Sequence, residues 1–278
     1  MDYRAITVDG NWLARSMYEV GICAKGFISK LCMLKTEFRP AVIYVAWDAR
    51  PSTYVGRKAM FSSYKGQRAP APNTFWDEVR GLREILSSFN VAQVTGPGEG
   101  DDIIATIVRE LPGPHLIFSI DKDMFQLVSE EVHLFRNGEV LTPEDVTNTT
   151  NINPQHWRAY QAIMGDSADN VPGVSGLGSV KAKQILEVAP YAVEAVLDGR
   201  GQKLAEHLAE NEKIAKMILK MDNEKFKLMV SYSLVGLYNI ELQFAPPAYD
   251  AKRALSWLGK RRLTNDLYKA VERMGERV

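Results

Sequence analysis

The chain has 278 residues, and its 34 basic and 34 acidic side chains give a formal net charge of zero. Hydrophobic residues make up 46% of the chain, enough to form the core of one large domain or two ordinary ones. No apolar run approaches the roughly 18 residues of a membrane helix, so we expect no membrane span. Cys23 and Cys32 lack metal-site spacing, which indicates free thiols in a reducing cytosol.

Short apolar runs alternate with helical spacing as far as Leu141. The expected strands are Ala5–Asp9, Ala41–Asp48, Val91–Thr95 and Leu116–Ile120, and the expected helical segments are Trp12–Lys35, Thr74–Phe89, Asp101–Leu111 and Met124–Val128. The runs Val132–Arg136 and Glu139–Leu141 flank an Asn-Gly pair, which predicts a hairpin. Strands alternating with helices predict an α/β fold, with a mostly parallel central sheet and covering helices in a PIN-like core.

From Pro143 onward the sequence is dominated by helical patterns. The expected helices are Pro154–Met164, Gly178–Val188, several within Ala189–Lys227, and one or two within Asp250–Met274. We therefore expect an α/β core over residues 1–142 and a helical part over residues 143–278. The alternative is that both parts form one globule.

Carboxylates stand where the predicted strands end. Asp9, Asp48 and Asp121 close three of the apolar runs. The carboxyl ends of parallel strands meet at one crevice, so these acids should converge there. Converging carboxylates repel and hold protons unless cations neutralise them, and all-oxygen ligand sets suit Mg²⁺ and Mn²⁺. The sequence therefore predicts a hard-metal site.

Further acids follow the same pattern. Glu99, Asp101 and Asp102 stand at a predicted helix start, and Asp123 comes two residues after Asp121. Asp166 and Asp169, three residues apart, would share one helical face. Helix capping would explain one acid at a helix start, and an ordinary polar loop would explain the Asp-Lys-Asp pair. Capping accounts poorly for three acids within four residues, whereas the polar loop stays open as an explanation of the Asp-Lys-Asp pair.

The stretch 165–178 is the most specific in the chain. Its second half, Val-Pro-Gly-Val-Ser-Gly-Leu-Gly, predicts a glycine-rich hairpin between two helices. Backbone amides at Gly173, Gly176 and Gly178 could approach a phosphate closely, and Lys181 and Lys183 follow on the next helix. The alternative is a plain helix–helix turn, for which one or two glycines would suffice.

Basic residues are segregated although the net charge is zero. The segment 50–68 contains no acid, and residues 251–278 carry eight basic residues against three acidic ones. The basic residues of the first segment are Arg50, Arg57, Lys58, Lys65 and Arg68. Interleaved with Tyr64 and other aromatic residues, they suit a surface that follows a nucleic-acid strand. Taken alone, a solvated basic loop explains the segment better.

In combination these motifs resemble those of the flap endonuclease superfamily of 5′-nucleases. The matching stretches are Val8–Gly10, Trp47–Asp48, Tyr64–Arg68, Gly98–Ala105, Ser119–Val128 and Gly165–Gly178, in the order the family has them. The chain is most similar to bacteriophage-type 5′–3′ exonucleases and to the 5′-nuclease domain of bacterial DNA polymerase I. The resemblance implies 5′–3′ exonuclease and flap endonuclease activity in replication or repair. It also implies two Mg²⁺ ions, for which Mn²⁺ can substitute.

The same resemblance implies roles for the residues. Asp9, Asp48, Glu99 and Asp101 would hold the first ion, and Asp121, Asp123, Asp166 and Asp169 the second, with Asp101 or Asp102 between them. Lys65 and Arg68 would steer the scissile phosphate and Tyr64 would stack on a base, all within an arch or gateway at about 50–76. Arg50, Arg57 and Lys58 would contact DNA. A helix–hairpin–helix element at about 157–188 would grip duplex DNA, with K⁺ held by its carbonyl groups.

The implied partner is branched, nicked or 5′-ended duplex DNA, with an RNA/DNA hybrid as a further substrate. We expect a monomer without an attached polymerase domain, in the cytoplasm of a bacterium or of a phage-infected host. Two alternatives stay open. A PIN-like ribonuclease is usually shorter and lacks the helix–hairpin–helix, and a junction-binding protein of the same fold would have weak catalysis or none. Divalent-metal-dependent turnover separates the second alternative from a nuclease.

Overall fold

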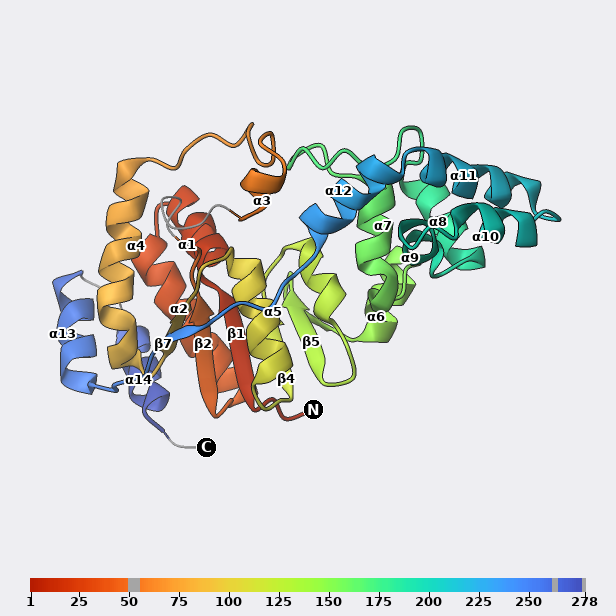
Figure 1. The fold of residues 1–278 in the computed structure, drawn as a ribbon. Coiled ribbons are helices and arrows are strands. Elements are labelled where there is room, and N and C mark those ends of the chain that lie inside the picture. The colour runs from red at the N-terminus through yellow and green to blue at the C-terminus, as the bar shows by residue number, and fades with distance from the viewer. Residues whose placement is uncertain (50–55, 262–264, 277–278) are drawn as a thin grey trace. The chain divides into compact units, whose positions relative to one another are not determined.

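The computed structural model describes residues 1–49, 56–261 and 265–276 (Figure 1). Its internal contacts define two compact units. Unit 1 comprises Met1–Tyr54, Pro70–Thr142 and Tyr238–Val278, and unit 2 comprises Val55–Ala69 and Pro143–Leu237. The division into 1–142 and 143–278 stays a prediction. The contact-based units differ from it by grouping 55–69 with the helices and 238–278 with the sheet.

The described strands of unit 1 form one seven-stranded sheet in the order β6-β5-β4-β1-β2-β3-β7. The strands are β1 Ala5–Asp9, β2 Val42–Ala46, β3 Ala92–Thr95, β4 His115–Phe118, β5 Val132–Arg136, β6 Glu139–Leu141 and β7 Gln243–Ala245. The five inner strands pair in parallel, and the edge strands β6 and β7 are antiparallel to their neighbours. This arrangement confirms the predicted α/β class and its mostly parallel sheet.

β1 lies at the centre of the sheet, where the direction of strand progression reverses. Val8 of β1 is level with Val45 of β2 on one side and with Phe118 of β4 on the other. Ligands of open α/β sheets bind outside the carboxyl ends of strands at such a switch point. Asp9, the last residue of β1, therefore stands at the position where a site is expected.

Helices cover both faces of the sheet. Those of unit 1 are α1 Gly10–Glu19, α2 Cys23–Phe38, α4 Asn73–Ile85, η1 Leu86–Phe89, α5 Gly100–Glu110, η2 Lys122–Leu127, α13 Ala251–Lys260 and α14 Asn265–Met274. Ile6 and Val8 share a buried core with Phe27 and Leu31 of α2, and this core also takes in α1, α4, α13 and α14. The helix α5 contacts β1, β2 and β3 and contributes nothing to that core, so it covers the opposite face.

The predicted helical stretch Trp12–Lys35 is two helices in the structure. Gly21 lies between them at φ +74°, a left-handed conformation that glycine adopts without the steric cost of a Cβ. Both cysteines lie on α2, buried and free of disulfides. Burial raises the pKa of the Cys23 thiol to about 11 and that of Cys32 to about 12, which makes both inert near neutral pH.

The regular secondary structure of the described part of unit 2 is helical. Its helices are α3 Gly56–Met60, α6 Pro143–Thr150, η3 Pro154–His156, α7 Trp157–Met164, α8 Ser179–Val188, α9 Ala192–Leu197, α10 Gly201–His207, α11 Glu212–Asn223 and α12 Lys225–Val235. The pair α7 and α8 packs together and flanks the glycine-rich stretch, as the predicted helix–hairpin–helix requires. The helix α12 packs against α3, α7 and α9. Throughout the described ranges, every helix is too short or too polar to cross a bilayer.

Candidate active site

Asp9 ends β1 and caps the helix that follows it. Its Oδ1 accepts a hydrogen bond from the Trp12 N–H at 3.0 Å, which is the usual task of aspartate at an N-cap. Its Oδ2 accepts a second hydrogen bond from the Ser119 hydroxyl, also at 3.0 Å. The residue is only 8% exposed. The centre of the sheet therefore presents a buried acid that is already hydrogen-bonded through both oxygens.

The surroundings of Asp9 disfavour its charge. Burial raises the pKa of this carboxyl group from its ordinary 3.8 to about 7, although the hydrogen bond from Trp12 acts in the opposite direction. The negative charges of Asp48 and Asp121 raise the pKa further. Such a carboxyl group holds a proton near neutral pH unless a cation lies beside it. The site is therefore short of positive charge.

Asp48 follows β2 and lies against the first turn of α5. Its Oδ1 accepts a hydrogen bond from the Gly100 N–H at 2.6 Å, and its own N–H donates to Asn11 Oδ1 at 3.1 Å. A Cβ at position 100 would lie only 2.9 Å from the same carboxylate oxygen, so this approach depends on glycine. Helix N-termini stabilise negative charge. Asp48 is therefore held beside α5, and its charge acts on Asp9.

Glu99 and Asp102 form the capping box of α5. Asp102 Oδ2 accepts from the Glu99 N–H at 3.4 Å, and Oδ1 accepts from the Tyr238 N–H at 3.0 Å. Asp102 is 1% exposed. The structure places it as a buried helix cap, and its predicted role between two metal ions stays a prediction. Of the two adjacent acids Asp101 and Asp102, the structure therefore favours Asp101 as the metal ligand.

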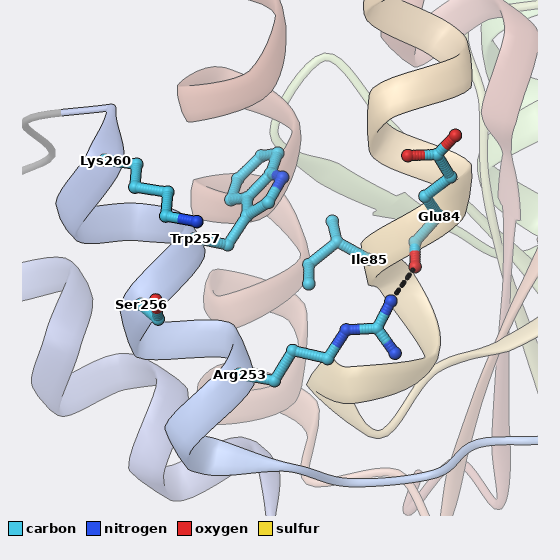
Figure 2. A pocket seen from close by; sticks show the side chains of 6 residues that line it. All are labelled: Glu84, Ile85, Arg253, Ser256, Trp257 and Lys260. Atoms are coloured by element: carbon cyan, nitrogen blue, oxygen red, sulfur yellow. Dashed lines mark hydrogen bonds between the residues drawn. The ribbon is translucent and has the colours of Figure 1, made fainter.

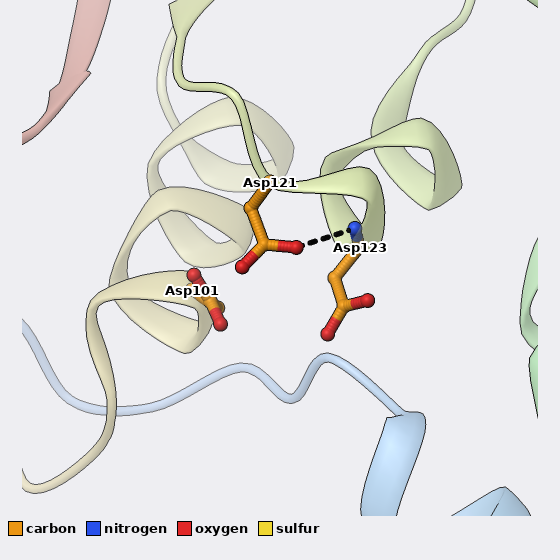
Figure 3. A group of neighbouring side chains, drawn as sticks. All are labelled: Asp101, Asp121 and Asp123. Atoms are coloured by element: carbon orange, nitrogen blue, oxygen red, sulfur yellow. Dashed lines mark hydrogen bonds between the residues drawn. The ribbon is translucent and has the colours of Figure 1, made fainter. Parts of the chain in front are cut away.

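Three of the predicted ligands come together within unit 1. Asp101 in the first turn of α5 and Asp121 and Asp123 at the start of η2 each offer an oxygen within 4.8 Å of the others (Figure 3). The Asp123 N–H donates to Asp121 Oδ1 at 2.9 Å, which fixes the turn between these two acids. Among the described residues, Asp9, Asp48 and Glu99 fall outside this close group. Three half-buried carboxylates at this spacing fit a hard divalent cation.

Ser119 is a candidate site residue that the sequence reasoning missed. Its hydroxyl donates to Asp9 and accepts from the Asp121 N–H at 3.1 Å, so it links the central acid to the close group. The available signal is a hydroxyl between an apolar strand and an acid pair. That signal is weak, because serine is common in such loops.

Asp166 and Asp169 belong to unit 2. They lie between α7 and α8, where Asp166 and Val171 form an isolated antiparallel bridge. Asp166 Oδ1 accepts from the Ala168 N–H at 2.8 Å, and Asp169 pairs with Arg68, whose Nη2 lies 2.5 Å from Oδ1. They are not in the close group of unit 1. Their metal-binding role stays a prediction.

The motif Tyr64–Arg68 also belongs to unit 2. Tyr64 is buried, with 5% of its surface exposed, and the ammonium group of Lys65 lies 5.1 Å from its ring centre. A buried ring does not suit the predicted stacking on a base, so we give Tyr64 a packing role. Lys65 is half-buried, and the Arg68 side chain is 57% exposed. These two cations remain candidates for the predicted phosphate contact.

The other basic residues of this segment differ from one another. Arg57 is 3% exposed, and its guanidinium donates to the carbonyl oxygens of Leu234 at 2.9 Å and Gly236 at 2.6 Å. It therefore anchors α3 to the end of α12 and is unsuited to the predicted DNA contact. Lys58 is exposed and suits one. Arg50 lies outside the described residues.

The glycine-rich hairpin is tightly folded at its base and exposed at its tip. A Cβ on Gly173 would lie 2.7 Å from the nitrogen of Gly165, so only glycine permits this contact. The Gly173 N–H donates to Ser231 Oγ on α12 at 2.9 Å. Gly176, Gly178 and Lys181 are exposed, whereas Lys183 is half-buried. The exposed tip suits contact with a large polyanion.

Two hairpin partners were also missed by sequence reasoning, Glu224 between α11 and α12 and Lys227 on α12. Glu224 Oε2 accepts from the Ser175 hydroxyl at 2.7 Å and from Lys227 Nζ at 3.0 Å. These hydrogen bonds, with the Ser175 bond first, lower the pKa of Glu224 to about 2. Nothing in the sequence pattern marks Glu224, because it lies 49 residues from Ser175.

The predicted K⁺ site at the hairpin stays a prediction, and the structure bears on one of its carbonyl groups. A K⁺ ion held by hairpin carbonyl groups needs their oxygens to face it. The Gly176 carbonyl oxygen instead accepts a hydrogen bond from Lys181 Nζ at 2.9 Å. The side chain of Lys181 thereby brings a positive charge to the hairpin.

A hollow of about 210 Å³ lies between α4 and α13 in unit 1 (Figure 2). It is lined by Glu84, Ile85, Arg253, Ser256, Trp257 and Lys260. Arg253 Nη2 donates to the Glu84 carbonyl oxygen at 3.2 Å (Figure 2). The lining gathers basic residues of the 251–278 segment and offers a single carboxylate. It therefore has the wrong chemistry for a second divalent-metal site.

Comparisons with known proteins agree with the α/β fold and the acidic site described above. Residues 8–152 match the family model described as 5′–3′ exonuclease, N-terminal resolvase-like domain. The chain is 36% identical over 168 residues to a 5′–3′ exonuclease of Aquifex aeolicus, covering 58% of this chain and 57% of that one. It is 31% identical over 200 residues to the thermostable DNA polymerase I of Thermus aquaticus, covering 66% of this chain. The match covers 24% of the polymerase, so this chain spans about a quarter of the polymerase's length.

A solved structure supports the fold. The flap endonuclease of bacteriophage T5, in a pseudo-enzyme–product complex with DNA and metal ions, superposes with a TM-score of 0.68. The match covers 98% of this chain and 99% of that one, at 20% sequence identity. At that identity the likeness establishes the shared fold.

Proposed function

Because the chain belongs to the family of 5′–3′ exonuclease N-terminal domains, we propose that it hydrolyses phosphodiester bonds near the 5′ ends of DNA. The proposed substrates are branched, nicked or 5′-ended duplexes, cut by 5′–3′ exonuclease and flap endonuclease activity. The close group of Asp101, Asp121 and Asp123 carries the proposal, because metal-assisted phosphodiester hydrolysis needs such a cluster. The flap endonuclease named above, solved with DNA and metal ions, supports DNA as the substrate class.

The proposed cofactor is Mg²⁺, with Mn²⁺ as a substitute that oxygen ligands also accept. Asp101, Asp121 and Asp123 would hold divalent ions together with Asp9, Asp48 and Glu99, and Asp166 and Asp169 would complete the ligand set. Bound divalent ions lower the pKa of a coordinated water and stabilise charge on the attacking and leaving oxygens of a phosphodiester.

The protein's own groups prepare the site. The Asp9 carboxyl group keeps a proton up to about pH 7 while Asp48 and Asp121 face it without a cation. Asp9 would lose that proton once the charges of these neighbours are neutralised, and it could then serve as a ligand near neutral pH. Ser119 holds Asp9 and the Asp121 backbone in one arrangement through its hydroxyl.

Cationic side chains of unit 2 would bind the substrate backbone. Lys65 and Arg68 would offset charge that develops on the scissile phosphate. Lys58 and Lys181, both exposed, would contact phosphates of the flanking strands. The target nucleotide must leave the duplex stack to be cut, which costs about a few kcal/mol and less at frayed ends or junctions. This cost would favour flaps and nicks as substrates.

Cleavage of a 5′-labelled flap substrate tests the proposal. We would measure single-turnover rates with Mg²⁺ and with EDTA for the wild type, Asp121→Asn and Glu139→Gln. Asparagine can still accept the Asp123 N–H, so Asp121→Asn should fold normally and lose at least about 100-fold in rate. Glu139 is an exposed carboxylate on β6, and its replacement should leave the rate unchanged.

The products decide between the two proposed activities. Single nucleotides released from the 5′ end would indicate exonuclease action, whereas one longer fragment would indicate flap cutting. Metal-independent cleavage, or full activity in Asp121→Asn, would contradict the assignment of the acids. Tight binding to junction DNA without any metal-dependent turnover would favour the catalytically weak junction-binding protein instead.

A further inference from the structure

Within unit 2, the segment 63–68 is bonded to the loop 167–170. Gln67 Nε2 donates to Asn170 Oδ1 at 2.7 Å, and Asn170 Nδ2 donates to the Ser63 carbonyl oxygen at 2.7 Å. The Lys65 N–H donates to the Asp169 carbonyl oxygen at 3.1 Å. These bonds join positions more than 100 residues apart, just where two proposed phosphate-binding residues stand.

We propose that Gln67 and Asn170 are positioning residues that set Lys65 and Arg68 in the arrangement needed for cleavage. This inference rests on the proposed function, since it concerns the same site. Gln67 and Asn170 are neutral amides and would take no part in proton transfer or metal binding. In this proposal they act on the reaction by holding the backbone that carries the two cations.

One amide side chain fixes both ends of the turn. Asn170 donates to Ser63 at its beginning and accepts from Gln67 near its end. Asn170 itself is left-handed, at φ +57°, a conformation that asparagine tolerates better than most residues. Asparagine at position 170 can therefore adopt this backbone conformation and still present its side-chain amide to the turn.

The turn needs such support because Lys65 is also left-handed, at φ +51°. A lysine has no special preference for this region, so an isolated turn would relax from it. The bond from its N–H to Asp169, flanked by the two bonds of Asn170, opposes that relaxation. We infer that the direction of the Lys65 side chain depends on these contacts.

Arg68 is tied to the same loop through its charge. Its Nε and Nη2 both lie near Asp169 Oδ1, at 3.0 Å and 2.5 Å. An ion pair with a 57% exposed arginine is weak by itself, so it cannot fix the turn alone. The uncharged hydrogen bonds of Asn170 hold the backbone of the turn. They therefore keep the Arg68 guanidinium close to Asp169 even when the ion pair between them breaks.

The amide contacts lie beside an open hollow of about 550 Å³. It is lined by Phe61, Ser63, Gln67, Ser167, Asn170, Val171 and Pro172. Gln67 is exposed and Asn170 is half-buried, so replacing either one creates no cavity in the core. Variants at these positions should therefore fold, which makes the proposal testable.

The test compares Asn170→Gly, Gln67→Met, the double variant and Ser63→Ala. Glycine keeps the left-handed backbone and removes both side-chain bonds, and methionine keeps the length of Gln67 without its donor. Ser63→Ala is the matched control, because only the Ser63 backbone carbonyl takes part. Amide hydrogen exchange at residues 64–68 and single-turnover cleavage with measured DNA affinity are the two readouts.

We expect Asn170→Gly to speed exchange of the Lys65 amide and to slow cleavage by about tenfold or more, since small misplacements of catalytic groups have such effects. DNA affinity should stay within about twofold. Gln67→Met should have a smaller effect in the same direction, and the double variant should be no slower than Asn170→Gly, because that change already removes the shared bond. Ser63→Ala should match the wild type.

Wild-type exchange and wild-type cleavage rates in Asn170→Gly and Gln67→Met would overturn the inference. So would faster exchange without slower cleavage, or a loss confined to DNA affinity. Failure of the proposed function looks different, since the wild-type protein itself would then show no metal-dependent cleavage.

Discussion

Replacing Asp9 by asparagine should abolish metal-dependent cleavage and yet make the metal-free protein more stable at pH 8. An asparagine at this position can accept the Trp12 N–H through Oδ1 and donate through Nδ2 to the Ser119 hydroxyl, so both hydrogen-bonded neighbours keep a partner. The substitution removes the buried charge. Stability and activity should therefore change in opposite directions, as expected where function requires a strained site.

The size of the effect follows from the pKa of Asp9. A pKa of about 7 in place of 3.8 corresponds to about 4 kcal/mol, because each pH unit is worth about 1.4 kcal/mol. The folded protein binds more protons than the unfolded chain between these two values, so the free energy of unfolding falls as the pH rises through this range. The loss is complete above about pH 7 and absent below about pH 4.

Urea unfolding in EDTA from pH 4 to pH 8, followed by tryptophan fluorescence, measures this directly. Asp9→Asn should exceed the wild type in free energy of unfolding by up to about 4 kcal/mol at pH 8 and equal it near pH 4. Asp77→Asn is the control, because Asp77 forms an exposed ion pair with Arg80 and should change stability little. A wild type more stable than Asp9→Asn at pH 8, or a difference independent of pH, would refute the reasoning.

Two further predictions concern the hairpin. Gly173→Ala should destabilise the protein by about 1–3 kcal/mol, because a Cβ would meet the Gly165 nitrogen at 2.7 Å and the φ of Gly173 is +61°. Thermal unfolding measures this loss. Gly178→Ala is the control, because no atom lies within 4 Å of the new Cβ there. Binding to duplex DNA should be equal in KCl and NaCl at matched ionic strength, since Lys181 already occupies the Gly176 carbonyl. Fluorescence anisotropy would show this, and a clear preference for KCl would support the predicted K⁺ site instead.

Local patterns predicted the sheet and its acids well. The strands that end at Asp9 and Thr95 were predicted because apolar runs ended by polar residues are a local signal. The Asn-Gly hairpin was predicted for the same reason, and Asn137 and Gly138 both have the positive φ that its turn requires. The short edge strand β7 was missed, since three exposed residues give no periodic signal.

The features that could not be predicted depend on contacts between distant segments. In the sequence Arg57 resembles a solvent-facing cation. In the structure its guanidinium donates hydrogen bonds to carbonyl oxygens 177 and 179 residues away. The burial of Tyr64 could not be predicted for a similar reason, because an aromatic residue in a basic loop looks the same in sequence whether it is buried or exposed. Asp101 and Asp102 are adjacent in the sequence, but Asp101 belongs to the close group whereas Asp102 is a buried helix cap. The Tyr238 N–H that binds Asp102 is 136 residues away.

In the proposed function, Asp101, Asp121 and Asp123 hold the divalent cations of a 5′-nuclease. Anomalous diffraction from crystals soaked in Mn²⁺ would locate these cations, with Asp121→Asn crystals treated in the same way. We predict an anomalous peak bounded by these three carboxylates in the wild type and a much weaker one in the variant. Strong Mn²⁺ peaks elsewhere with none at this group, in a protein that still cleaves DNA, would contradict the account.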